Sequence, residues 1–237
     1  TGINQNWNYM CADCHSTNLR KNFNLENNTY QTSWSEVDVS CEACHGPASK
    51  HIELAKSLNN SEFRNLPDKG LAIRFPIAGN DKWSFPKNSS IAKLQSLRSS
   101  IKLIDTCARC HSRRSSLNSS KPYLGSLHDN YLVSSLDQGL YHADGQMNDE
   151  TYVYGSFIQS KMYRAGVNCI DCHNAHSLEL LEKGNALCLQ CHKQTKFDTE
   201  SHHFHPADTA AAQCVSCHMP AKNYMVIDSR RDHSFRV

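Results

Sequence analysis

The chain has no run of about 18 consecutive apolar residues, which a membrane-spanning helix needs, so we predict no transmembrane segment. It begins at Thr1 without the basic and apolar stretches of a secretory signal, which we expect to have been removed or to lie outside this sequence. Basic residues form no long run, and the formal net charge is only +2. These properties predict no nucleic-acid partner.

Apolar residues are also scarce. Hydrophobic residues make up 39% of the 237 positions, aromatic residues 8%, and the mean hydropathy is −0.60. A chain of this composition buries too little apolar surface to form a full core from its own side chains. We therefore expect the polypeptide to wrap around some other apolar material.

No cysteine is left over for a disulfide framework. All 12 cysteines occur in pairs separated by two residues, and a histidine directly follows each pair. The six motifs are Cys11/Cys14/His15, Cys41/Cys44/His45, Cys107/Cys110/His111, Cys169/Cys172/His173, Cys188/Cys191/His192 and Cys214/Cys217/His218.

Cys-x-x-Cys-His is the attachment signature of c-type haem. The two thiolates add to the vinyl groups of one porphyrin, and the adjoining imidazole binds the iron as proximal ligand. Paired cysteines also occur in zinc sites and in redox disulfides, but neither requires a histidine after every pair. We therefore predict six haem c groups, which supply the missing apolar core.

Six haems leave about 40 residues for each, too few for a separate core around every one. We expect a single hexahaem domain over 1–237 that is mainly α, with much irregular loop and little β. The fourth, fifth and sixth motifs follow one another closely, so their haems should form one tight cluster.

Apolar spacing predicts helices over 91–105, 129–138 and 154–165, the last ending at Gly166. A further helix should begin after Pro47. The alternation of β-forming residues over 29–39 predicts a short ribbon.

Each iron has a second axial position, and eight of the 14 histidines lie outside the motifs. His51 shares a predicted helical face with Ala55 and Leu58, and His176 follows the fourth motif closely, so both should lie beside a haem. An iron with two histidine ligands only passes electrons, whereas an open position binds a small molecule.

The run His202-His203-Phe204-His205 should supply one or two ligands, and side chains 203 and 205 share a face if this run is extended. Methionine is another common ligand, but the histidines suffice without it, so we expect bis-histidine ligation. The predicted distal ligands are His51, His128, His142, His176, His203, His205 and His233.

Residues 5–10 before the first motif, 16–19 after it, and 40–47 followed by His51 resemble the multihaem cytochromes related to the tetrahaem cytochrome of nitrifiers. That group includes pentahaem nitrite reductases and octahaem hydroxylamine and tetrathionate enzymes. Residues 139–146 and 230–235 resemble multihaem cytochromes that carry tetratricopeptide repeats.

The resemblance implies distal ligation by His51 and His233. Relatives usually have further sequence at both ends, so we expect the chain to be part of a longer protein. The nitrite reductases mark their catalytic haem with a lysine in place of the motif histidine, and no such motif occurs in this sequence.

We therefore predict an exported electron carrier, periplasmic or extracellular, and not an enzyme. Its partners should be redox proteins, among them other multihaem cytochromes. The alternatives are a reductase or oxidase of small nitrogen or sulfur compounds with one open haem, and a homo-oligomeric filament subunit. The basic pairs Arg113-Arg114 and Arg230-Arg231 are candidates for offsetting haem propionates.

Overall fold

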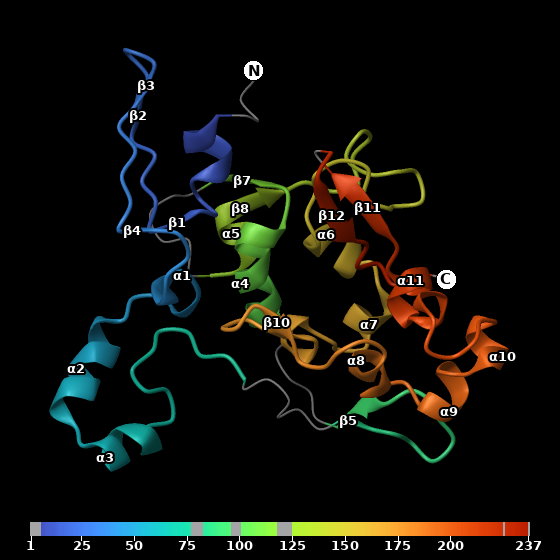
Figure 1. Ribbon diagram of the computed structural model, residues 1–237. Coiled ribbons are helices and arrows are strands. Elements are labelled where there is room, and N and C mark those ends of the chain that lie inside the picture. Colours follow the sequence, from blue (N-terminus) through green and yellow to red (C-terminus); the bar gives the residue numbers. More distant parts are fainter. Residues whose placement is uncertain (1–5, 77–82, 96–100, 118–124, 225, 237) are drawn as a thin grey trace. The chain divides into compact units, whose positions relative to one another are not determined.

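The computed structural model describes residues 6–76, 83–95, 101–117, 125–224 and 226–236. The chain divides into two compact units. The first comprises Thr1–Phe75, Asp105–Cys110 and Arg114–Val133, and the second comprises Pro76–Ile104, His111–Arg113 and Ser134–Val237. Both contain short helices and two-stranded antiparallel sheets (Figure 1).

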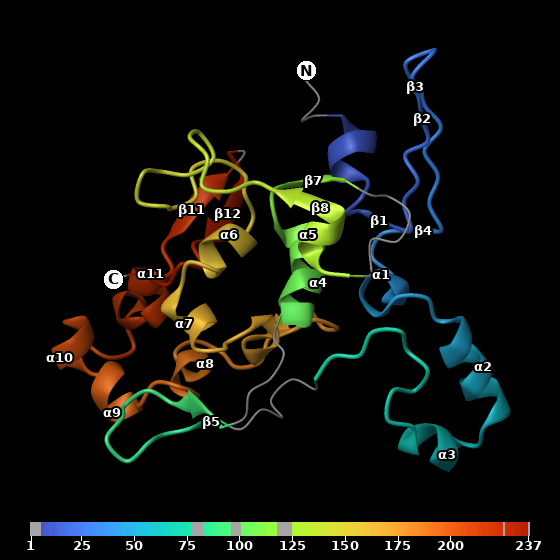
Figure 2. The same cartoon turned by 180° about the vertical axis from the view of Figure 1, so that it is seen from behind.

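The first unit begins with a single π-helical turn and three short helices joined by ribbons. Its elements are η2 (Trp7–Cys11), β1 (Ser16–Thr17), β2 (Phe23–Asn24), β3 (Thr29–Tyr30), β4 (Glu36–Val37), α1 (Cys41–His45), α2 (Ser49–Ser57), α3 (Asn60–Asn65), β7 (Arg114–Ser116), α5 (Leu127–Asn130) and β8 (Tyr131–Val133). Strands β1 and β4, β2 and β3, and β7 and β8 pair. Both views show α5 beside the β7–β8 ribbon (Figure 2).

Most of the second unit follows residue 134. Its elements are β5 (Trp83–Ser84), β6 (Lys93–Leu94), α6 (Tyr154–Phe157), α7 (Lys161–Arg164), η3 (Cys169–Asp171), β9 (His173–Asn174), β10 (Glu179–Leu180), α8 (Ala186–Leu189), α9 (Gln194–Phe197), α10 (Glu200–His203), η4 (Ala210–Ala212), α11 (Cys214–His218), β11 (Ala221–Tyr224) and β12 (Asp228–Arg231). Helix α4 (Ile101–His111) contains residues of both units.

Side-chain cores in the described residues are small. In the second unit Tyr141, Met147 and Tyr224 pack together with Leu140, and the Tyr224 hydroxyl donates to the Met147 carbonyl at 3.1 Å. Buried Met147 therefore acts as a packing residue. This limited packing agrees with the low hydrophobic content of the sequence.

The predicted helix after Pro47 is confirmed as α2, although its half-buried side chains are His51, Leu54 and Leu58, while Ala55 is exposed. The helix expected over 154–165 occurs as α6 and α7, and Gly166 follows with φ +91°. The ribbon expected over 29–39 contains strands β3 and β4, each paired with an earlier strand.

Two predicted helices are wrong in part or whole. Residues 91–94 are extended because Ile91 bridges to His192 and the Ala92 amide donates to the Cys191 carbonyl at 2.8 Å. Residues 96–100 of the predicted helix lie outside the described residues, and its last part, from Ile101 on, is helical in α4. The helix expected over 129–138 is replaced by the end of α5 and by β8, which pairs with β7.

Low β content is confirmed, since the sheets formed by the described residues have two strands each. A mainly α description is too strong, because the helices are short and ribbons alternate with them.

Candidate haem sites

The six motifs lie on or beside short helical turns. The second motif is helix α1, the third ends α4, and the sixth is α11, while the first begins at the last residue of η2, the fourth begins at η3, and the fifth overlaps α8. Positions i, i+3 and i+4 share one face of a helix. A helical motif therefore presents both cysteines and its histidine on one side.

All 12 cysteines lie in the described part of the chain, and none of them forms a disulfide. Within the same described residues, no three or more His, Cys, Asp or Glu side chains converge as they would around a metal ion. The cysteine pairs therefore do not gather in fours, as zinc sites of four thiolates would require.

The cysteines differ in how far the surrounding chain covers them. Cys11, Cys41 and Cys217 are exposed, and the other nine are half-buried. Cys217 lies three residues after Cys214 in α11, and its exposed side chain is accessible for thioether formation. The role of Cys217 in haem attachment therefore rests on the motif alone.

Four histidines hold their rings in the manner of iron ligands. The Nδ1 atoms of His45 and His218, both motif histidines, lie 2.9 Å from the Ile73 carbonyl oxygen and 3.0 Å from that of Arg236. A carbonyl oxygen only accepts hydrogen bonds, so Nδ1 carries the proton in each ring. The Nε2 lone pair is thereby directed to the ligand side, as in most histidines that bind metals.

His15, the motif histidine nearest the start of the chain, departs from this pattern. Its side chain is exposed. Its backbone is held, since the His15 amide donates to the Cys11 carbonyl at 3.1 Å and its carbonyl accepts the Asp38 amide at 3.1 Å. No described residue accepts a hydrogen bond from its ring, so the fold does not fix the tautomer of His15 as it does at His45. Proximal ligation by His15 stays a prediction from the motif.

The carbonyl contact at Nδ1 also occurs at two histidines outside the motifs. Nδ1 of His51 lies 2.8 Å from the Lys69 carbonyl oxygen, and Nδ1 of His233 lies 2.9 Å from that of Arg231. Both were predicted as distal ligands, and both have the tautomer that ligation through Nε2 requires.

Two pairs of imidazoles face each other at the spacing of axial ligands. The ring centroids of His173 and His233 are 6.4 Å apart with 25° between the planes, and those of His202 and His218 are 6.2 Å apart with 9°. Two imidazoles on opposite sides of one iron have centroids about 6.3 Å apart, because each metal–nitrogen bond is about 2.0 Å long. Both centroid separations match that spacing.

The run 202–205 was predicted to supply one or two ligands; the choice among its histidines was left open, with His203 and His205 favoured if the run is extended. The run 202–205 is not extended: His202 and His203 end helix α10, and Phe204 follows with φ +61°. The helix directs His202 toward His218, whereas Nδ1 of His203 accepts the His205 amide at 3.3 Å. The sequence signal for this helix is Glu200 after Thr199, since an acidic residue is favoured in a first turn.

The remaining predicted ligands lie in turns or short elements with exposed side chains. His128 is on α5, His142 follows Leu140–Tyr141, and His176 is in the turn between β9 and β10. His51 and His45 belong to the same unit. The ring of His51 contacts Phe63, whereas the ring of His45 contacts Phe75.

Motifs that are distant in sequence contact each other within the first unit. The Cys14 Sγ lies 3.8 Å from the Cys110 carbonyl oxygen, and the hydrogen bond between the two thiols lowers the pKa of Cys14 and raises that of Cys110. Burial, and then the nearby Cys107 thiol, raise the pKa of Cys44. Cysteines of the first and second motifs thus lie beside those of the third.

In the second unit the later motifs follow one another. The thiols of Cys188, in the fifth motif, and Cys214, in the sixth, form a hydrogen bond. This hydrogen bond raises the pKa of Cys188 and lowers that of Cys214 to about 7. Burial raises the pKa of Cys172 to about 11, with Asp171 and Cys191 nearby. The fifth motif therefore lies next to both the fourth and the sixth, as the short sequence gaps predicted.

Loss of solvation also favours the neutral form of the candidate ligands. It is the largest cause of the lowered pKa of His111, His173, His192 and His233, although His111 and His173 keep part of their surface exposed. The neighbouring His173 ring lowers the pKa of His111 and His233 further, so these three rings lie near one another. Neutral imidazole is the form that binds iron.

The basic pairs already have protein partners. Arg114 is buried and forms an ion pair with Asp13 at 2.8 Å, and Arg230 pairs with Glu150 at 2.7 Å. Arg231 donates to the carbonyl groups of Val215 and Met219 at 3.1 and 2.9 Å.

A different arginine, Arg109 in the third motif, is buried, and its Nε and Nη1 have no hydrogen-bond partner. The two thiols Cys44 and Cys110 and the carboxyl of Asp105 are near enough to act on its charge, but burial is stronger and lowers its pKa.

Two family models match parts of the chain. Residues 2–46, with the first two motifs, match the family of cytochrome c554 and c-prime. Residues 161–197, with the fourth and fifth motifs, match the doubled CXXCH motif family. The chain is a multihaem c-type cytochrome. The narrower resemblance to nitrifier-related and repeat-carrying cytochromes stays a prediction.

Two solved cytochrome structures align with this chain. The crystal structure of the outer cell wall cytochrome OcwA has a TM-score of 0.58 and 17% identity, over 98% of this chain and 56% of that one. An undecaheme cytochrome from the S-layer of Carboxydothermus ferrireducens has a TM-score of 0.36 and 20% identity, over 98% of this chain and 39% of that one. The first likeness shows the fold. The cytochrome spans little more than half the length of OcwA, and no curated protein matches it.

Proposed function

We propose that the cytochrome passes electrons along six covalently bound haem c groups and performs no chemistry beyond redox. The observation that carries this proposal is the contact between motifs: Cys14 with Cys110 in the first unit, and Cys188 with Cys214 in the second. Thioethers at these cysteines would attach neighbouring haems close to each other. Closely spaced haems would favour electron transfer over separate catalytic sites.

The residues of the chain bind and tune the group. Iron porphyrin supplies one-electron chemistry when bound. The 12 cysteines would hold it as thioethers, and the six motif histidines would bind its iron. Carbonyl acceptors at Nδ1, as at His218, raise the basicity of the imidazole and fix its orientation.

The distal side is assigned from the ring pairs. His233 would bind the haem iron held by His173, and His202 would bind the one held by His218, because the ring separation of each pair matches that of two imidazoles on one iron. His51 serves a haem of the first unit through Nε2. Two imidazoles on an iron leave no position for a substrate, which favours an electron carrier over a reductase or oxidase.

We further propose that the cytochrome acts outside the cytoplasm, with other redox proteins, among them multihaem cytochromes, as donors and acceptors. Covalent haem attachment after export supports this location. Among the described residues no helix is both long and apolar enough to cross a membrane.

The test combines mass with spin state. Denaturing mass spectrometry should give the polypeptide plus six haem masses, and electron paramagnetic resonance of the oxidised protein should show low-spin haem only. Fewer haems with unmodified thiols would refute the stoichiometry. A high-spin ferric signal that shifts on adding nitrite or sulfite would favour the enzymatic alternative.

A further inference from the structure

One short segment, 231–236, touches both imidazole pairs of the second unit. His233 lies in this segment and faces His173. Three residues later, the Arg236 carbonyl oxygen accepts the Nδ1 proton of His218, the histidine that faces His202. The position of the segment therefore affects axial ligands at both the fourth and the sixth motif.

The segment is folded on itself by two polar side chains. The Asp232 carboxylate accepts the Ser234 amide at 2.9 Å and the Ser234 hydroxyl at 2.8 Å. Both side chains are buried. The Asp232 amide donates to the Pro220 carbonyl at 3.1 Å, which attaches the segment to the end of the sixth motif.

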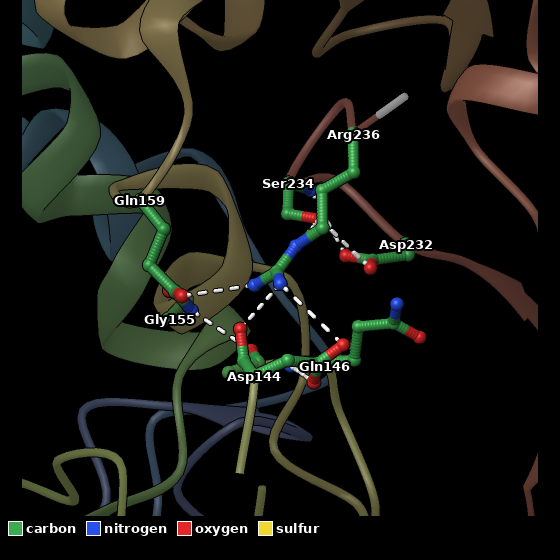
Figure 3. Close-up of polar contacts among 8 residues, drawn as sticks. Asp144, Gln146, Gly155, Gln159, Asp232, Ser234 and Arg236 are labelled. Atoms are coloured by element: carbon green, nitrogen blue, oxygen red, sulfur yellow. Dashed lines mark hydrogen bonds and ion pairs between the residues drawn. The ribbon is translucent and has the colours of Figure 1, made fainter. Parts of the chain in front are cut away.

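The side chain of Arg236 connects this segment to Asp144, in the loop before α6, and to Gln159, just after that helix (Figure 3). Its Nε donates to the Ser234 hydroxyl at 3.0 Å, and its Nη2 donates to Gln159 Oε1 at 3.1 Å. Its Nη1 lies 3.6 Å from the Asp144 carboxylate and also donates to the Asp144 carbonyl. Gln159 is held in turn, since its Nε2 donates to the carbonyl groups of Gly145 and Gly155 at 3.0 and 2.9 Å.

Gly145 leaves room for this contact. Its backbone has φ +84°, and an added Cβ would meet Gln159 Oε1 and lie 3.0 Å from Arg236 Nη2. A glycine is needed there both for the left-handed conformation and for the close approach of the two side chains. Gly145 thus allows Gln159 and Arg236 to pack closely against the backbone.

We propose that Arg236 is a positioning residue for the proximal ligand His218. The side chain holds its own carbonyl at the Nδ1 atom of that histidine, and the fold of 231–236 transmits the same restraint to His233. A strong acceptor at Nδ1 makes the imidazole a better donor to ferric iron, so it lowers the reduction potential of the sixth haem. This inference rests on the proposed haem ligation.

The experiment compares Arg236→Gln with the parent protein by electron paramagnetic resonance and by a spectroelectrochemical titration. We expect the haem mass and the low-spin count to stay the same. One low-spin signal should move its g values, and one haem should titrate at a higher potential. At a fixed potential the ratio of reduced to oxidised haem at that site should rise roughly tenfold.

Two further variants make the result specific. Arg236→Lys retains the charge and should restore part of the shift. Arg164→Gln removes an exposed arginine from α7 in the same unit, so it matches the change in charge and should leave both measurements unchanged. Gln159→Met removes the acceptor of Arg236 Nη2 and leaves the sequence of 231–236 unchanged. It should show the shift expected for Arg236→Gln, so it can replace Arg236→Gln if the latter does not fold.

Unchanged g values and potentials in both Arg236→Gln and Gln159→Met, with six low-spin haems present, would overturn the positioning role and leave the proposed function intact. Missing haems or high-spin iron in the parent protein would instead refute the proposed ligation itself.

Discussion

Replacing His202 by alanine tests the distal assignment most directly. The His202 ring faces His218 with centroids 6.2 Å apart and planes inclined by 9°. Its other aromatic neighbour is Phe197, at 5.5 Å and 88°, which has no lone pair to bind iron. Loss of the imidazole should therefore leave the sixth haem with one protein ligand.

The size of the effect follows from the ligand count. About one haem in six should change from low to high spin. Imidazole stabilises ferric iron, so its loss should also raise the potential of that haem by on the order of 0.1 V, or about 2.3 kcal/mol for one electron. Spin quantitation of the oxidised protein measures the first change, and a potentiometric titration followed optically measures the second.

Adjacent residues supply the controls. His203 and His205 belong to the same run but do not face a motif histidine, so alanine at either position should keep all haems low-spin. The assignment would be refuted by a full low-spin count in His202→Ala. It would be refuted equally by a high-spin signal that appears only when His203 or His205 is replaced.

Three further predictions concern other parts of the protein. Burial lowers the pKa of His233, so its neutral form contributes stability above the ordinary histidine pKa of about 6.5, and this contribution is lost as the pH falls through the lowered value. The low-spin spectrum should persist at pH 6.5 and change only in more acidic solution, and a transition centred above that pH would contradict the assignment. Arg109→Met removes a buried positive charge. The interaction of that charge with an electron on a haem about 10 Å away is worth about 1.7 kcal/mol at an effective dielectric of about 20, so a haem of the first unit should titrate about 70 mV lower. An unshifted titration would contradict this prediction. Gly70→Ala places a Cβ 2.8 Å from Leu54 Cδ1 and 3.0 Å from the His51 amide nitrogen, at a residue whose φ is +73°. The substitution should lower the unfolding free energy by about 1–2 kcal/mol and alter one low-spin signal. Unchanged denaturation and spectra would exclude close packing of Gly70 on His51.

Features that depend on adjacent residues were predictable from the sequence. Each thioether pair and its proximal histidine must lie within five residues, because one porphyrin edge and one iron determine their spacing. Cys217 and His15 show how far this local rule reaches, since both are exposed and only the motif assigns them a role. Helix α2 was predictable for a similar reason, since Pro47 and the periodic apolar residues act locally. His51 was thereby found on the half-buried face of that helix.

Features that depend on distant residues required the tertiary structure. The apolar spacing of 91–104 is helical, yet Ile91 pairs with His192 and remains extended, because backbone pairing to the fifth motif outweighs local preference. Local rules did not identify Arg109 either, since its burial depends on residues from several parts of the first unit.

The distal ligands show this division most clearly. His202, His203 and His205 are the same residue type in one short run, so the residue type does not distinguish them. An extended run would have favoured His203 and His205 as ligands. The short helix α10 instead turns His202 toward His218. His233 meets His173 only because the segment after β12 folds back on Asp232 and Arg236. Proximal ligation can be predicted from the local sequence because the proximal histidine directly follows the cysteines that attach the haem. Distal ligation depends on where the fold brings a second imidazole.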